Sequence, residues 1–189
     1  MRFERNSSRK QIMVKPIVIA IAAIPAIIAL LIAIPLVTKP DIPFSAATPN
    51  DTLEIEYTKH QLKKISYGVT DRVGSEKTEI LLIKNNGEIK YSVTEQGYPN
   101  PEIKSKIDED QHKKLKALIK ETGFMAIQSE SFPILENVTQ YQKSSVKITL
   151  NGKVNQIYWP EQNATSKFIP PIITMIESQL DSVIDKIRE

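Results

Sequence analysis

The chain has 189 residues, no cysteine and a formal net charge of +3. Without cysteine it cannot form disulfides, thiolate zinc sites or a cysteine nucleophile. Residues 1–15 hold five basic groups against one acidic group, whereas residues 50–189 hold 19 basic and 20 acidic groups. A basic surface for nucleic acid is therefore not expected in the larger part of the chain.

The first expected element is a membrane span, PIVIAIAAIPAIIALLIAIPLV, from Pro16 to Val37. These 22 residues carry no charge. As a helix they would be about 33 Å long, enough for a hydrocarbon core of about 30 Å. A cleaved signal and a buried helix are the alternatives, but the apolar part of a signal has only about 7–15 residues. We therefore expect a retained single-pass anchor in the cell membrane.

Basic residues before this span predict its orientation. The tail of residues 1–15 contains Arg2, Arg5, Arg9, Lys10 and Lys15, and only Lys39 follows the span closely. Because positive flanks stay in the cytoplasm, the N-terminus is expected inside and the rest of the chain outside. The tail is also expected to contact anionic lipid headgroups.

Residues 38–52 are rich in Pro, Thr, Ser and Ala, which indicates a short stalk. Three N-x-S/T motifs follow the span and begin at Asn50, Asn137 and Asn163. They are candidate glycosylation acceptors, which agrees with a position outside the cell.

From Leu53 the pattern becomes that of strands. LEIEY alternates, and the alternation returns at residues 65–69. EILLIKNNGEIKYSV then predicts a hairpin with a two-residue turn at Asn86-Gly87. A second hairpin is predicted in SVKITLNGKVNQIYW, with its turn at Asn151-Gly152 and its end at Pro160.

Two helices are predicted in the same region. The first has Asp108 as N-cap, Gln111 in a capping-box position, and Gly123 at its end. The second runs over residues 170–187 with an isoleucine-rich stripe that should pack on the sheet. The order β, β-hairpin, α, β-hairpin, α predicts one α+β domain at 53–189, with a mainly antiparallel sheet and helices on one face.

The residues that most often carry chemistry form no familiar pattern. His60 and His112 lie in basic polar stretches and are expected to be solvated. The run Asp108-Glu109-Asp110 suits a helix N-terminus and lacks the spacing of a calcium loop. Ser144 and Lys147 form a Ser-x-x-Lys match, but on a strand they face opposite sides. We expect no catalytic residue, cofactor or metal site.

Two loops are candidates for binding because each contains an aromatic residue. EQGYPNPE holds Tyr98 between turn residues, and YWPEQNATSKF holds Trp159, the single tryptophan. Exposed aromatic side chains often anchor a partner. The alternative is that both side chains cap the edge of the core.

The succession EILLIKNNGEIKY, IDEDQHKKLKALIKETGFMAI, SVKITLNGKVNQI and a terminal amphipathic helix resembles small bacterial α+β domains over about residues 62–187. Some of these are uncharacterised, and others are emfourin-like inhibitors of metalloproteases. The resemblance implies a binding or inhibitory domain without enzymatic activity. It assigns no functional residue to this chain.

Three hypotheses follow for function. The first is an anchored extracytoplasmic domain that binds a protein, a peptide or an envelope component without catalysis. The second is an anchored hydrolase with dispersed acidic residues. The third is an accessory subunit that joins a larger membrane complex through its span.

Overall fold

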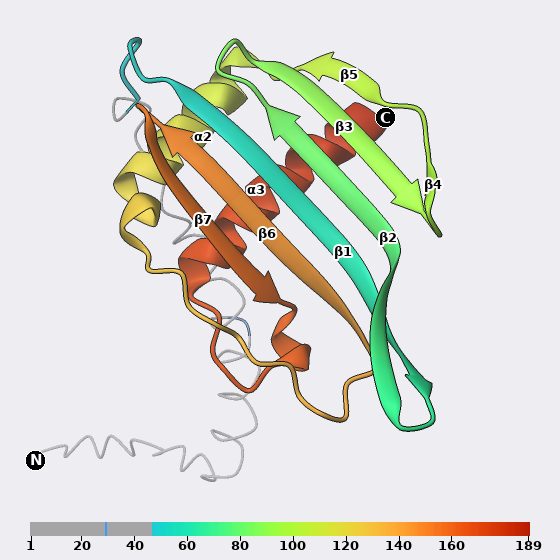
Figure 1. The fold of residues 1–189 in the computed structure, drawn as a ribbon. Coiled ribbons are helices and arrows are strands. Elements are labelled where there is room, and N and C mark those ends of the chain that lie inside the picture. The colour runs from blue at the N-terminus through green and yellow to red at the C-terminus, as the bar shows by residue number, and fades with distance from the viewer. Residues whose placement is uncertain (1–28, 30–46) are drawn as a thin grey trace, which may run out of the picture. The chain divides into compact units, whose positions relative to one another are not determined.

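A computed structural model describes Ala29 and residues 47–189. Residues 47–189 fold into a seven-stranded antiparallel sheet with two α-helices behind it (Figure 1). The strands are β1 (Leu53–Tyr67), β2 (Thr70–Ile83), β3 (Glu88–Glu95), β4 (Tyr98–Pro99), β5 (Ile103–Lys106), β6 (Gln140–Leu150) and β7 (Lys153–Pro160). The helices are α2 (Glu109–Glu121) and α3 (Pro171–Arg188), with short 3-10 helices at Phe124–Ala126 and Gln162–Ala164. The predicted α+β class and antiparallel sheet are confirmed.

The core lies between the sheet and the two helices. The strand order is β4-β3-β2-β1-β6-β7, and β5 also pairs with β3. Alternate residues of the central strands face the helices, as Leu53, Ile55 and Tyr57 do in β1. The predicted stripe of α3 packs against them, and its fully buried members are Ile173, Ile176, Leu180, Val183 and Ile184.

The helix ends lie next to the capping residues that the sequence predicts. Asp108 caps α2 by accepting a hydrogen bond from the Gln111 backbone N–H at 3.3 Å. Gly123 adopts a φ of 67°, a left-handed conformation that ends this helix at little steric cost. Pro171 is the first residue of α3, where its missing N–H would have had no helical partner.

One predicted turn is confirmed and the other is wrong. Asn151 and Gly152 have φ values of 50° and 78°, as a two-residue hairpin turn requires. At the β2–β3 turn, the Lys84 N–H donates to the Glu88 carbonyl and the Gly87 N–H donates to the Lys84 carbonyl. The loop therefore has three residues, and only Gly87, with a φ of 81°, is left-handed. This is a turn followed by a glycine bulge, which NNG allows equally well.

The first two strands are longer than their pattern suggests. β1 pairs with β2 as far as Tyr67, but with β6 only as far as Lys63. The tip of the β1–β2 hairpin is thus a two-stranded ribbon beyond the rest of the sheet (Figure 1). A register shift between Gln61 and Leu62 interrupts the alternation, so this part of β1 does not read as a strand. The short strands β4 and β5 were also not predicted.

The predicted span, Pro16–Val37, lies outside the described residues except for Ala29. Within the described part of the chain, no helix combines the length and apolarity needed to cross a membrane. The end of the predicted stalk is fixed to the domain. The carboxylate of Asp51, which is 6% exposed, accepts hydrogen bonds from Lys120 Nζ at 2.7 Å and Asn151 Nδ2 at 2.8 Å. The folded unit therefore includes residues before Leu53, the predicted boundary.

Candidate functional site

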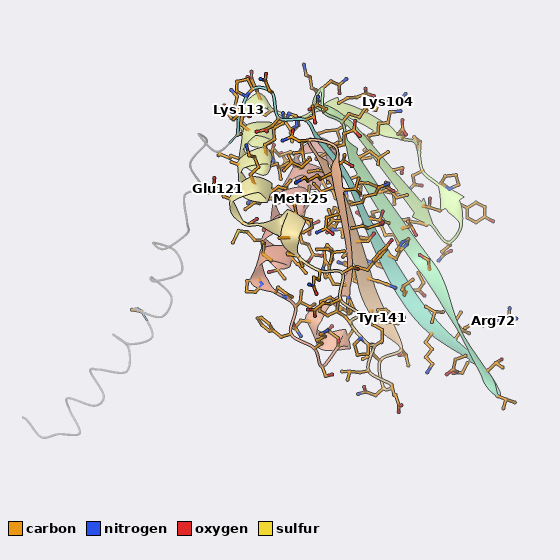
Figure 2. The ribbon with its side chains drawn as sticks, turned by 60° about the vertical axis from the view of Figure 1, so that its left-hand side comes forward. Arg72, Lys104, Lys113, Glu121, Met125 and Tyr141 are labelled. Atoms are coloured by element: carbon orange, nitrogen blue, oxygen red, sulfur yellow. The ribbon has the colours of Figure 1, made fainter. Side chains whose placement is uncertain are left out.

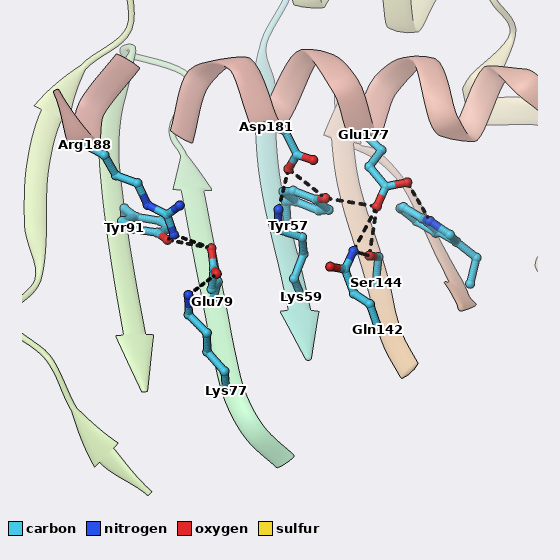
Figure 3. A network of polar contacts seen from close by, with 11 residues as sticks. Tyr57, Lys59, Lys77, Glu79, Tyr91, Gln142, Ser144, Glu177, Asp181 and Arg188 are labelled. Atoms are coloured by element: carbon cyan, nitrogen blue, oxygen red, sulfur yellow. Dashed lines mark hydrogen bonds and ion pairs between the residues drawn. The ribbon is translucent and has the colours of Figure 1, made fainter. Parts of the chain in front are cut away.

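A first polar cluster joins α3 to the sheet (Figure 3). The carboxylate of Glu177 accepts hydrogen bonds from the Trp159 indole N–H at 3.1 Å, the Ser144 hydroxyl at 3.0 Å and the Tyr57 hydroxyl at 3.3 Å. Asp181 lies one turn further along α3 and contacts Lys59 Nζ at 2.8 Å. The i, i+4 spacing puts both carboxylates over the same strands.

Tyr57 stands between these two carboxylates. Its single O–H proton is shared between Glu177 and an Asp181 oxygen at 3.1 Å, and the side chain is 1% exposed. Burial raises the pKa of Tyr57 strongly, and the negative charges of Glu177 and Asp181 raise it further. Tyr57 therefore remains a hydrogen-bond donor and is not a candidate base.

A second cluster lies at the C-terminal end of α3 (Figure 3). Glu79 accepts hydrogen bonds from the Tyr91 hydroxyl at 2.6 Å and from Arg188 at 2.7 Å, and it pairs with Lys77 at 2.9 Å. Arg188 also donates to Tyr91. Burial alone would raise the pKa of Glu79, but these partners outweigh it and lower the pKa. Glu79 is thus held as a carboxylate.

Both clusters serve packing better than catalysis. Ser144 is 2% exposed and contacts a carboxylate, so its hydroxyl cannot reach a substrate from solution. The side of α3 beside the clusters is an open surface formed by Thr174, Glu177, Ser178, Asp181, Ser182, Asp185, Lys186 and Glu189. Two of its carboxylates, Glu177 and Asp181, already accept hydrogen bonds from the sheet. Among the described residues no three side chains are grouped as metal ligands.

The two histidines differ from the prediction, since each is half-buried and not solvated. His60 Nδ1 lies 2.9 Å from the Thr78 hydroxyl on β2, and burial followed by the Lys143 charge lowers the pKa of His60. Burial followed by the Lys116 charge lowers the pKa of His112. His112 Nε2 is buried without a hydrogen-bond partner. The structure does not bring the two histidines together with any carboxylate pair.

The two candidate binding aromatics have different surroundings. Trp159 is 1% exposed and belongs to the core, as the alternative interpretation held. It is therefore no longer a candidate anchor. Tyr98 is 78% exposed in β4, directly after a turn at Gln96 and Gly97 with φ values of 50° and 85°. Tyr98 remains a candidate.

The predicted glycosylation acceptors Asn50, Asn137 and Asn163 are all exposed. Their modification remains a prediction.

Among the elements that the structure describes, none covers the face of the sheet opposite the helices. Figure 1 looks onto this face, with α2 and α3 behind the strands. Alternation of exposure along the strands assigns to it Glu54, Glu56, Thr58 and His60 of β1, Thr78, Ile80 and Leu82 of β2, Lys90, Ser92 and Thr94 of β3, Lys143, Ser145, Lys147 and Thr149 of β6, and Val154, Gln156 and Tyr158 of β7. We call this set the uncovered face.

The uncovered face mixes apolar and charged side chains. Val154 is 59% exposed and Tyr158 is 45% exposed, while Ile80 and Leu82 are partly exposed near the centre. A shallow hollow of about 230 Å³ is lined by Glu54, Ile55, Glu56, Leu82, Ile83, Lys84, Lys147 and Thr149. The sequence did not identify this face as a candidate site, because polar alternation alone does not say whether a partner covers the polar side of a strand.

Comparison with known proteins adds no assignment. No protein-family model matches this chain. No curated protein matches it either. The resemblance to emfourin-like inhibitors therefore stays a prediction that rests on the order of elements and on the quoted segments.

Proposed function

We propose that this chain is a single-pass membrane protein whose domain binds a protein, peptide or envelope component outside the cell without catalysis. The observation that carries the proposal is the uncovered face. One side of the sheet is packed under two helices, and the other presents partly exposed Ile80 and Leu82 with exposed Val154 and Tyr158.

The composition of this face suits a partner of protein character. Binding surfaces combine apolar contacts with a polar and charged rim. Here the apolar residues are framed by Glu54 and Glu56 on β1 and by three lysines, Lys90, Lys143 and Lys147. Both charge signs are present, so the proposed partner is a mixed polypeptide surface and not a polyanion.

The membrane placement in this proposal comes from the sequence. The uncharged segment Pro16–Val37 would anchor the chain, and the tail with Arg2, Arg5, Arg9, Lys10 and Lys15 would stay inside against anionic headgroups. Protease added to intact cells should then remove the chain beyond about residue 50 and spare the tail. Protection of the domain until the cells are lysed would reverse the orientation.

Site-specific photo-crosslinking in native membranes tests the binding surface. A photoreactive amino acid at Thr58, central on the uncovered face, should give one dominant adduct with a neighbouring protein or envelope component. The matched control is Gln179, an exposed residue of α3 on the opposite side of the domain. Equal adducts at both positions, or adducts at Gln179 alone, would remove the uncovered face from the proposal.

A deletion variant and the Gln179 position separate the other two hypotheses. An accessory subunit held by its span would keep its partner when residues 47–189 are deleted. A hydrolase would give adducts at the open surface of α3, where Glu177 and Asp181 lie, and Gln179 would then label more strongly than Thr58.

A further inference from the structure

The two edges of the sheet differ in how they could meet another strand. One edge is formed by β4 and β5, which have two and four residues. Lys104 and Lys106 lie on β5, and short lysine-bearing strands protect an edge against pairing. The other edge is β7, which has eight residues. It offers a longer row of backbone groups.

The hydrogen-bond register fixes which groups of β7 point outward. The Glu161 N–H donates to the Gln142 carbonyl, and the Asn151 N–H donates to the Thr52 carbonyl. In an antiparallel pair, every second residue of a strand forms backbone hydrogen bonds with the neighbouring strand. Since Gln142 is bonded to Glu161, the even-numbered residues of β6 form backbone hydrogen bonds with the odd-numbered residues of β7. The backbone N–H and C=O groups of Val154, Gln156 and Tyr158 therefore point away from β6.

These three outward positions are uncharged and have no hydrogen-bond partner within the described residues. The neighbouring chain segment approaches from the helix side, where Asn155 Nδ2 donates to the carbonyls of Phe124 and Ile127. Pro160, which has no N–H, ends the row. The edge is thus a three-position pairing template with a defined end.

We propose that two copies of this chain pair through β7, antiparallel and centred on Gln156. In this register Gln156 lies opposite Gln156 of the second copy, and Val154 lies opposite Tyr158. All three pairs join outward-pointing positions, so each pair exchanges two main-chain hydrogen bonds. The two sheets become one continuous sheet, and the uncovered faces of both copies lie on the same side.

The side chains favour a second copy over a foreign strand. Val154 and Tyr158 are the exposed large apolar residues of β7, and they lie two positions before and two positions after Gln156. With a two-fold axis at Gln156, Val154 of one copy lies opposite Tyr158 of the other copy. Pairs of an aromatic and a β-branched residue stabilise antiparallel strands. In this register, no two like charges lie opposite each other at the outward positions.

Cysteine crosslinking in native membranes tests this register, because the full chain has no cysteine of its own. Paired Cα atoms at Gln156 would lie about 5.5 Å apart, within the range of a disulfide. Gln156→Cys should therefore give a disulfide-linked dimer under mild oxidation. Val154→Cys alone should not, since its two copies would be about 14 Å apart. Co-expressed Val154→Cys and Tyr158→Cys chains with different tags should form a mixed dimer.

Lys104→Cys is the matched control, because Lys104 occupies an outward position on the opposite edge. It should remain monomeric under the same oxidation. Absence of the Gln156→Cys dimer, or equal crosslinking of Lys104→Cys, would overturn the proposal.

A charge exchange provides a second, non-covalent test on the full chain in detergent. Gln156→Lys sets two lysines opposite each other, and Gln156→Glu sets two carboxylates opposite each other. Each should raise the dimer dissociation constant about fivefold or more. An equal mixture of the two variants should restore the dimer mass in sedimentation. A dimer unaffected by either variant, or unrestored by their mixture, would exclude pairing at Gln156.

Discussion

The two faces of the sheet are built from the same strands and have opposite environments. Leu81 is 0% exposed beneath the helices, whereas the next residue, Leu82, is partly exposed on the uncovered face. The covered face supplies the buried contacts that hold the domain together. The uncovered face leaves part of its apolar side chains in contact with solvent.

Polar groups show the same contrast. On the covered side Glu177 and Glu79 each have several partners, because a buried carboxylate without them would be costly. On the uncovered face Glu56 has a long contact of 3.9 Å with Lys147, and both side chains are about half exposed. Such an exposed pair contributes little to stability. Stability and proposed binding thus lie on opposite sides of one sheet.

The largest expected effect compares the two neighbouring leucines. Leu81→Ala should destabilise the domain by about 2–5 kcal/mol, because it removes a fully buried side chain. Leu82→Ala should cost about 1 kcal/mol or less, since part of this side chain is already in water. Urea denaturation of fragment 47–189, which we expect to fold alone, measures both. Equal costs would mean that the two faces are not different in the way described.

The next effect concerns the cluster at Glu177. Glu177→Ala removes the acceptor of the Trp159 indole N–H and should cost about 1–3 kcal/mol. Because Trp159 is the single tryptophan, its fluorescence should shift in the same variant. Glu54→Ala, on the uncovered face, is the control and should change stability by less than about 0.5 kcal/mol. A silent Glu177→Ala variant would show that the cluster does not hold α3 on the sheet.

Local patterns in the sequence were sufficient for much of this fold. The alternation around Leu53, the Asn151-Gly152 turn and the stripe of α3 each depend on residues close in the chain. The continuity of β1 was missed because the register shift at Gln61 and Leu62 falls in a polar stretch. NNG does not specify the length of its loop, because the same residues suit a two-residue and a three-residue turn.

The candidate site was harder to predict, because its partners are distant in the sequence. Glu177 accepts hydrogen bonds from Trp159, 18 positions away, and from Tyr57, 120 positions away. A partial signal existed in the spacing of Glu177 and Asp181 on one side of a helix. No local pattern shows which strand faces that helix, and the sequence left open whether Trp159 lies in the core or anchors a partner.

A smaller effect is expected at Asp51, which fastens the chain entering β1 to α2 and the β6–β7 turn. The Lys120 hydrogen bond, followed by that of Asn151, lowers the pKa of Asp51 well below its ordinary value. Because the pKa is lower in the folded state, the ionised carboxylate stabilises the fold at pH values above the unfolded pKa of about 4. This stabilisation is lost progressively as the pH falls below about 4 towards the folded-state pKa. Asp51→Asn should therefore be less stable by about 1–2 kcal/mol at pH 7.

The pH dependence distinguishes this charge effect from a packing effect. The difference between wild type and Asp51→Asn in urea denaturation should shrink steadily below about pH 4. Glu54→Gln on the uncovered face should show no comparable change. A difference that stays constant down to pH 2 would mean that the carboxylate charge is not what fastens this segment.

The smallest effect separates the two faces through the two histidines. His60 belongs to the uncovered face and His112 to α2, and burial lowers the pKa of both below 6.5. Their second causes differ, since Lys143 acts on His60 and Lys116 acts on His112. Lys143→Gln should therefore raise the pKa of His60 slightly and leave that of His112 unchanged, because an exposed charge is strongly screened. Lys116→Gln should do the reverse.

Proton NMR of the two imidazole rings follows both titrations. A shift of both histidines in either variant would mean that the two faces are electrostatically coupled through the sheet and cannot be treated as separate surfaces.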